Sequence, residues 1–353
     1  MKVFSKLPGS RQITSAIFVS LFLTSSWSQE PSKYEPISEY KKIVLEDGST
    51  YFGQLENGLA SGLGTQTDVN GEQKTGYFQD GIFLGEYIVN PPWHLVDIYY
   101  DFEDSLLLES FSVDITMKDD IPDNLYLYLS TQNSEINNID FYNGIQTHCG
   151  GYKGVVGDNN FGDFVDLGRA SIFSRWLERS GTAMQIERSG VGESGGYEGD
   201  FISVRNALPW KKGKYTITLR NTHEKVTING VVHTFVSMLV FSHSKNILIQ
   251  TGSLAFPGEQ LYLDKSQAMF VELYHKRIPI SQIPLLHFQV DQIKVNGTLE
   301  PCIEPMAIYP LNAPQYAKAT FANGKFDIQI GKPFERKVFR LYKNDVIVED
   351  LYE

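Results

Sequence analysis

The chain has 353 residues, a formal net charge of -11 and an aromatic content of 13%, with Phe and Tyr the commonest aromatic residues. This length suffices for about two domains and at least one large core. Many aromatic residues and few charges exclude a disordered chain. An acidic sequence without a cluster of Lys and Arg also argues against nucleic acid as a partner.

The first 28 residues have the layout of a secretory signal peptide. Lys2, Lys6 and Arg11 give a basic start, residues 13–24 are mostly apolar, and Ser26 and Ser28 are the small residues before a cleavage point. The alternative is an uncleaved membrane anchor, but the apolar run is shorter than the roughly 20 residues that a span needs. We expect export to a secreted, periplasmic or cell-surface location, with no transmembrane segment after cleavage.

Residues 29–44 are polar and are expected to form a short leader. A repeat follows, in which four glycines recur 23 residues later: Gly48, Gly53, Gly58 and Gly62 are matched by Gly71, Gly76, Gly81 and Gly85. Glycine permits the positive φ angles of tight hairpin turns. Each unit is therefore expected to be a small β-hairpin that stacks on its neighbour, and residues 45–90 should form paired hairpins.

The run from Tyr51 to Gly64, YFGQLENGLASGLG, closely resembles a MORN repeat, which has Tyr-x-Gly, then a Gly, then Gly-x-Gly at this spacing. In the second copy Lys74 replaces the leading Tyr, and Tyr87 stands where the last Gly is expected. The resemblance implies a structural or protein-interaction module and implies no catalysis.

From Trp93 onward, short strand-like runs alternate with turns. Clear examples are residues 95–100, 111–117, 125–130, 215–219 and 269–274, and residues 224–241 form a hairpin around Asn229-Gly230. Many short strands at this spacing predict a mainly β fold. We expect MORN-type β-hairpins followed by an antiparallel β-sandwich, jelly-roll-like, over residues 91–300. A C-terminal β segment, residues 301–353, should pack on the sandwich.

Residues 93–275 carry a second resemblance. Its landmarks, in order, are Phe141-Tyr142-Asn143-Gly144-Ile145-Gln146-Thr147, Ile172-Phe173-Ser174-Arg175-Trp176, Gly196-Tyr197-Glu198-Gly199 and Pro209-Trp210-Lys211-Lys212-Gly213-Lys214-Tyr215. Their order is similar to the family named domain of unknown function 3472. The resemblance implies a β-sandwich of extracellular proteins and no established activity.

Two catalytic-looking patterns overlap between Ser189 and Glu198. Residues 190–195 fit G-x-G-x-x-G and residues 192–196 fit a nucleophile elbow around Ser194. Both patterns need a strand before them and a helix after them. The sequence after Gly195 is a poor helix start, so we interpret the segment as a glycine loop between two strands, with no catalytic residue.

This glycine loop, residues 190–200, is also the predicted ligand contact. Glu193, Tyr197, Glu198 and Asp200 offer a stacking surface and acceptors for sugar hydroxyls, and Trp210 is expected at the edge of a neighbouring hairpin. Trp176 is interpreted as a core residue. No metal and no cofactor is expected, because the histidines show no metal-ligand spacing.

Cys149 and Cys302 are the two cysteines. They are expected either to form one disulfide in an oxidising compartment or to remain as two buried free thiols.

Three functions remain open from the sequence. The first is an exported binding or adhesion protein, with an extracellular glycan or a protein as partner. The second is a structural or protein-interaction role through the hairpins, and the third is a polysaccharide-acting hydrolase.

Overall fold

The computed structural model describes residues 40–154, 162–197, 199–310, 316–334, 340–342 and 346–351. The expected signal peptide and Glu198 lie outside these ranges. The prediction of a mainly β fold is confirmed, because the described residues form antiparallel sheets and only two short 3-10 helices, η1 (Gly181–Ala183) and η2 (Ile280–Gln282). The described part contains no helix that is long and apolar enough to cross a membrane.

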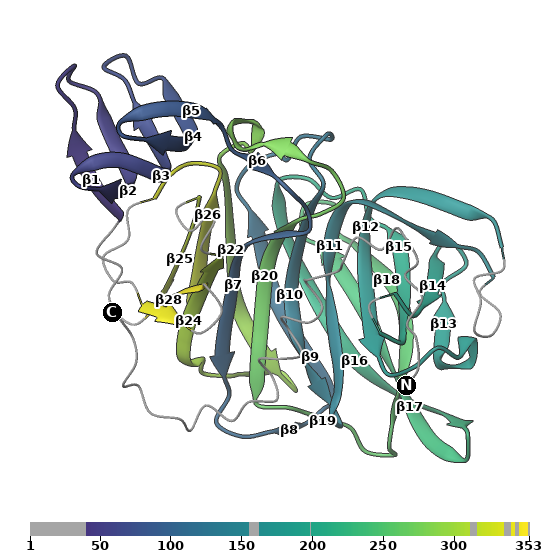
Figure 1. The fold of residues 1–353 in the computed structure, drawn as a ribbon. Helices are drawn as coiled ribbons and strands as arrows, with labels where there is room; N and C mark the ends of the chain where they lie inside the picture. The colour runs from purple at the N-terminus through teal and green to yellow at the C-terminus, as the bar shows by residue number, and fades with distance from the viewer. Residues whose placement is uncertain are drawn as a thin grey trace, which may run out of the picture.

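The hairpins form a five-stranded sheet at one end of the molecule (Figure 1). Its strands, in spatial and chain order, are β1 (Tyr40–Val44), β2 (Thr50–Glu56), β3 (Leu59–Thr67), β4 (Gln73–Gln79) and β5 (Ile82–Glu86). The predicted leader is therefore too long, because β1 begins at residue 40 and pairs with β2. Lys41 and Lys42 make that stretch polar although it is a strand, since an edge strand keeps one side in water.

The glycine repeat is a repeat of backbone geometry. Gly58 and Gly81 both have φ near +82°, each after a residue that also has positive φ, so both hairpins turn through the same two-residue loop. Gly53 and Gly76 serve a different need, because a Cβ at either position would lie within 2.5 Å of an atom of the facing strand. The prediction of paired hairpins is confirmed by the β2–β3 and β4–β5 pairings.

Two larger sheets form the sandwich. The larger one has spatial order β12-β15-β14-β11-β10-β20-β7-β24-β28-β27, with β12 also paired to β11, and with β19 paired to both β10 and β8. Its strands are β7 (Trp93–Asp101), β8 (Leu106–Leu107), β10 (Leu127–Ile136), β11 (Ile139–Tyr152), β12 (Phe164–Trp176), β14 (Val191–Gly195), β15 (Phe201–Ala207), β19 (Tyr262–Leu263), β20 (Ser266–Leu273), β24 (Ile303–Pro310), β27 (Arg340–Tyr342) and β28 (Val346–Asp350). Figure 1 shows β7, β20, β10, β11 and β12 side by side.

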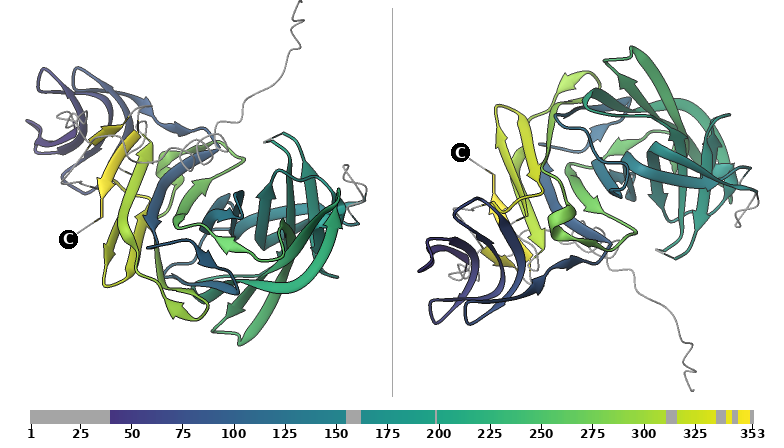
Figure 2. Two further views of the ribbon diagram at one scale, coloured as in Figure 1. Left: turned by 90° about the horizontal axis from the view of Figure 1, so that it is seen from below. Right: turned by 90° about the horizontal axis from the view of Figure 1, so that it is seen from above.

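The smaller sheet has order β13-β18-β17-β16-β9-β22-β26-β25, with β23 paired to β22. Its strands are β9 (Ser110–Met117), β13 (Met184–Ile186), β16 (Gly213–Ile228), β17 (Val231–Ser242), β18 (Ile247–Pro257), β22 (Leu286–Val295), β23 (Thr298–Leu299), β25 (Ala317–Ala322) and β26 (Lys325–Ile330). A two-stranded pair, β6 (Ile88–Val89) with β21 (Ile278–Pro279), links the hairpins to the sandwich. Figure 2 shows the hairpin sheet beside the sandwich in both views.

One hydrophobic core lies between the two large sheets, with Ile98 and Val271 from the larger sheet and Val113, Ile217 and Val236 from the smaller one, all at 0% exposure. The residues after 300 do not pack on this sandwich from outside. They contribute β24, β27 and β28 to the larger sheet and β25 and β26 to the smaller one, so the expected boundary at residue 300 falls inside one unit.

Candidate functional site

The larger sheet carries a row of rings on its outer face, the side away from the core. In β12 the side chains of Phe173 and Arg175 point inward, since Phe173 joins the core and Arg175 donates to the Ala255 carbonyl of β18 in the other sheet. Strand alternation then places Ile172, Ser174 and Trp176 outward, and Ile172 indeed belongs to a separate apolar cluster.

The outer aromatic row runs from β12 to β7 and consists of Trp176, Tyr142, Tyr128, Phe270 and His94. Successive ring centroids are 4.8, 5.9, 5.1 and 4.7 Å apart. The middle of the row is closed, because Tyr128 is 3% exposed and Phe270 is 8% exposed. Trp176 and Tyr142 are only partly buried. The end of the row at β12 is therefore the part with aromatic surface open to a ligand.

Three predicted site residues gather at this end. Glu193 lies on β14, and its carboxylate accepts hydrogen bonds from Tyr197 Oη at 3.0 Å and from the Arg205 guanidinium. Tyr197 is 54% exposed. Asp200 and Arg179 face each other at 3.9 Å, with side chains 61% and 37% exposed. The surface beside Trp176 thus presents a phenol, a carboxylate and a guanidinium to solvent.

The prediction of a glycine loop over residues 190–200 is wrong for residues 191–195. Residues 191–195 form β14, paired with β15, and the backbone of Gly190, Gly192 and Gly195 has ordinary negative φ. Gly195 is needed for packing, because a Cβ there would lie 2.7 Å from the Phe201 ring. Ser194 is 2% exposed and donates to the Arg179 carbonyl.

Trp176 and Trp210 have the opposite locations to those predicted from the sequence. Trp210 is 1% exposed, donates from Nε1 to the Gln146 carbonyl at 2.9 Å and lies under the Arg169 guanidinium at 4.6 Å. It follows β15 at the end opposite Tyr197, and Phe201 to Ala207 spans about 20 Å at strand rise. Trp210 is therefore a core residue, and Trp176 is the surface one.

Sequence reasoning missed Trp176, Tyr142, Arg179 and Arg205 as members of this surface. Arg205 could not be found from spacing, because only the β14–β15 register brings it beside Glu193. The backbone conformation of Leu177 marks this surface, but it is visible only in the structure. Leu177 has φ of +59° and is 69% exposed, which is rare for a leucine and fixes the chain directly after Trp176.

The other end of the row holds a histidine between two carboxylates. His94 Nδ1 is 2.5 Å from Asp97 Oδ1, and His94 Nε2 is 3.9 Å from Glu272 Oε1. All three side chains are less than 16% exposed. Burial lowers the pKa of His94, but Asp97 and Glu272 outweigh it and raise that pKa to about 9. His94 therefore carries a proton near neutral pH.

Of the two states expected for the cysteines, free thiols are the one found, with Cys149 buried and Cys302 partly buried. Cys149 lies on β11 and Cys302 directly precedes β24, and β10, β20 and β7 separate these strands. At about 4.8 Å per strand the sulfurs are far beyond disulfide reach. Burial raises the pKa of Cys149 to about 11 and that of Cys302 to about 12, so both stay protonated.

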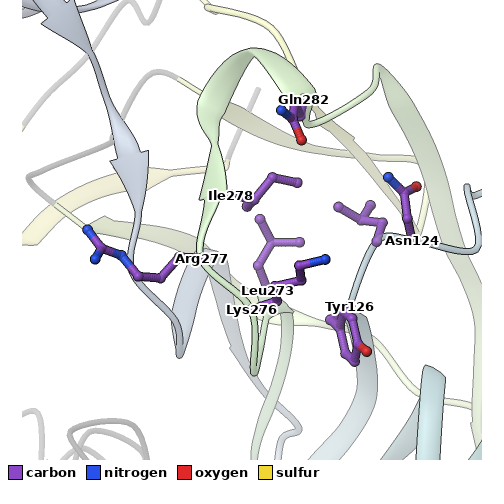
Figure 3. Close-up of a pocket in the computed structure, with 8 residues that line it drawn as sticks. Asn124, Tyr126, Leu273, Lys276, Arg277, Ile278 and Gln282 are labelled. Carbon is purple, nitrogen blue, oxygen red and sulfur yellow. The ribbon is translucent and has the colours of Figure 1, made fainter.

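Two hollows lie elsewhere on the described part of the molecule. The pocket in Figure 3 has about 40 Å³ of free volume, and Arg277 points away from it. That volume holds water rather than a sugar ring. A hollow of about 310 Å³ is lined by Asn137, Tyr262 and Asp264, among others, but the Asn137 amide is already bound to Pro257, Gln260 and Tyr262. Neither hollow offers an aromatic pair.

The described residues contain no group of three or more His, Cys, Asp or Glu side chains that could hold a metal ion. No family model matches the chain, and no curated protein matches it. Two solved structures of scytalido-glutamic peptidase, one with a transition state analog inhibitor and one with a peptide based transition state analog, align at a TM-score of 0.35 with 4% and 6% identity. Each alignment covers 68% of this chain and 98% of the other. Likeness at this level does not extend to family or activity.

Proposed function

We propose that the protein is an exported glycan-binding protein whose ligand lies on the outer face of the larger sheet, at the Trp176 end. The observation that carries this is the Trp176–Tyr142 ring pair, whose centroids lie 4.8 Å apart with an interplanar angle of 58° and whose rings are both partly exposed on the sheet. Sugar rings have flat apolar faces that stack on such aromatics, and their hydroxyls need donors and acceptors at the rim.

The polar groups around the ring pair suit that ligand. Tyr197 Oη and the Arg179–Asp200 pair offer both donors and acceptors within one surface, and Glu193, 15% exposed, accepts the Tyr197 hydroxyl. Glu193 is neutralised by Arg205, so the site does not repel a neutral or weakly acidic polysaccharide. Leu177 extends the apolar surface next to Trp176.

The test is affinity electrophoresis of the protein in gels that contain soluble polysaccharides, followed by titration calorimetry with any glycan that retards it. Trp176→Ala should weaken binding at least about tenfold, the loss of roughly one stacking contact. Phe164→Ala is the matched control, because Phe164 is an exposed aromatic residue at the far end of the same strand. Equal binding by the wild type and Trp176→Ala would end the proposal.

Export is part of the same proposal and is supported by the basic start, apolar run and Ser26–Ser28 junction. N-terminal sequencing of the mature protein should begin near Gln29, and a retained Met1 in a membrane fraction would contradict it. The kinship with MORN repeats is likewise a proposal. It is supported by the repeated turn geometry of the hairpin sheet.

A second candidate, a polysaccharide-acting hydrolase, is supported by His94, Asp97 and Glu272 at the other end of the row. Two carboxylates beside one bound sugar chain are what hydrolysis of a glycosidic bond by water requires. Release of reducing ends by the wild type, abolished in Glu272→Gln, would support it. A polysaccharide that binds and is never shortened would leave binding as the function.

A further inference from the structure

Tyr197 is an exposed residue that the backbone around it does not fix. It lies between β14 and β15, in a segment that contains Gly196 and Gly199, and Gly199 has φ of +94°. Glycine leaves the backbone free to adopt many conformations, so such a segment does not hold a side chain in place by itself. Tyr197 is also 54% exposed. The orientation of its ring therefore depends on contacts with the neighbouring strands.

Three contacts place this ring on the outer face of the larger sheet. A Cβ at Gly195 would lie 3.0 Å from Tyr197 Cε1, so the ring rests against the bare backbone of β14. The ring of Phe201 on β15 lies 5.0 Å away at 82°. The hydroxyl of Tyr197 donates to the Glu193 carboxylate at 3.0 Å. Because Phe201 pairs directly with Trp176 of β12, the ring of Tyr197 lies one strand beyond Trp176.

Glu193 holds this hydroxyl because Arg205 holds Glu193. The two side chains are 15% and 13% exposed, and the guanidinium donates to the carboxylate. It also donates to the Gly150 carbonyl of β11 and to Ser203 Oγ, 3.3 Å away on β15. A carboxylate buried to this extent needs a cation, and without one it takes up a proton or turns toward water. Arg205 thus ties three strands together and fixes the acceptor of the Tyr197 hydroxyl.

We propose that Arg205 is a positioning residue of the glycan site: acting through Glu193, it holds the exposed ring of Tyr197 in the orientation that meets the sugar. The inference rests on the proposed function for its ligand. A ring that is fixed before binding loses no rotamer freedom when the sugar arrives, whereas a free ring does. For one side chain this difference is worth up to about tenfold in Kd.

The first experiment measures the ring without any ligand, by nuclear magnetic resonance of the mature protein isotope-labelled at tyrosine Cε. The Tyr197 signal is the one that Tyr197→Phe lacks. In the wild type its order parameter should be near the rigid value of about 0.85, and in Arg205→Lys it should fall below about 0.6. A lysine keeps the charge but does not reach all three acceptors at once.

Arg169→Lys is the matched control. Arg169 lies on β12, its side chain is also 13% exposed, and it donates to the Ile121 carbonyl and to Asp123 rather than toward Tyr197. Arg169→Lys should lower the stability of the protein much as Arg205→Lys does, and it should leave the order parameter of Tyr197 unchanged. A ring loosened equally by both substitutions would show a general structural effect and would overturn the proposal.

The second experiment measures binding, by affinity electrophoresis in gels that contain laminarin, xylan or pectin. With a polysaccharide that retards the wild type, Arg205→Lys and Tyr197→Phe should each raise the Kd about three- to tenfold. The double variant should bind no worse than Tyr197→Phe alone, because Arg205 acts through the hydroxyl that is already lost. Additive losses in the double variant would contradict this.

Glu193→Ala keeps the first experiment decisive if Arg205→Lys fails to fold. It removes the acceptor of the Tyr197 hydroxyl and leaves the guanidinium bonded to Gly150 and Ser203, so it should free the ring in the same way. A ring that stays rigid in both variants would overturn the proposal. Absence of retardation by all three polysaccharides would count against the glycan function itself, while a ring loosened in Arg205→Lys alone would still show that Arg205 positions Tyr197.

Discussion

Replacing Trp210 and Trp176 separately by alanine distinguishes a core residue from a surface residue. Trp210 is 1% exposed and donates to the Gln146 carbonyl. Trp210→Ala should therefore cost about 3–5 kcal/mol for the cavity and about 1 kcal/mol more for the unpaired carbonyl. At about 2–4 °C per kcal/mol for domains of this class, the melting temperature should fall by roughly 10 °C or more. Trp176→Ala should cost only about 1 kcal/mol, because its ring already meets water.

Urea unfolding followed by far-ultraviolet circular dichroism measures both changes without depending on tryptophan fluorescence. Trp210→Phe should fall between the wild type and Trp210→Ala, since it keeps ring volume and loses the hydrogen bond. A Trp176→Ala protein as unstable as Trp210→Ala would refute the assignment of Trp176 to the outer face, and the proposed glycan-binding surface would lose one of its two exposed rings.

Three further predictions concern stability. Gly53→Ala should unfold the hairpin sheet, measurable as faster proteolysis after β2, because its Cβ would lie 2.5 Å from the Cα of Gly64. The folded pKa of His94, about 9, lies above its usual value of 6.5. The stability that His94 contributes is therefore complete below pH 6.5 and is lost as the pH rises through 9. A wild-type melting temperature that changes as little between pH 6.5 and 9 as that of His94→Gln would contradict this. Burial and the nearby Asp140 raise the pKa of Glu135 to about 6, because both disfavour its charged form. Glu135→Gln should therefore stabilise the protein at pH 7. A lower melting temperature of Glu135→Gln in calorimetry would contradict this.

Local turn chemistry is the part of the fold that the sequence predicts well. Asn229-Gly230 has φ of +51° and +80° and joins β16 to β17 as expected. The 23-residue glycine spacing predicts the hairpin sheet for the same reason, since each turn is decided by two adjacent residues. Strand neighbours are not decided locally, which is why the sequence predicts a loop where β14 lies and predicts C-terminal strands outside the sheets.

The sequence predicts Glu193, Tyr197 and Asp200 at the site but assigns Trp176 to the core, because polarity does not distinguish the two faces of β12. The sequence predicts that Ile172, Ser174 and Trp176 face the core, but the residues that face it are Ser171, Phe173 and Arg175. Arg175 can occupy the core because its guanidinium lies 5.2 Å from the Phe256 ring and bonds the Ala255 carbonyl. A charged residue satisfied in this way gives no sign of burial in the sequence.

The position of β7 governs the order in which the molecule can assemble. This strand lies early in the chain, but its two neighbours in the larger sheet are β20 and β24, which are made more than 160 residues later. During synthesis β7 therefore has no partner strand until most of the chain has been made. Such non-local pairing slows folding, because the entropy of closing long loops is lost before contacts compensate for it. Until β20 and β24 are made, β7 is an unpaired strand that is exposed to association with other chains.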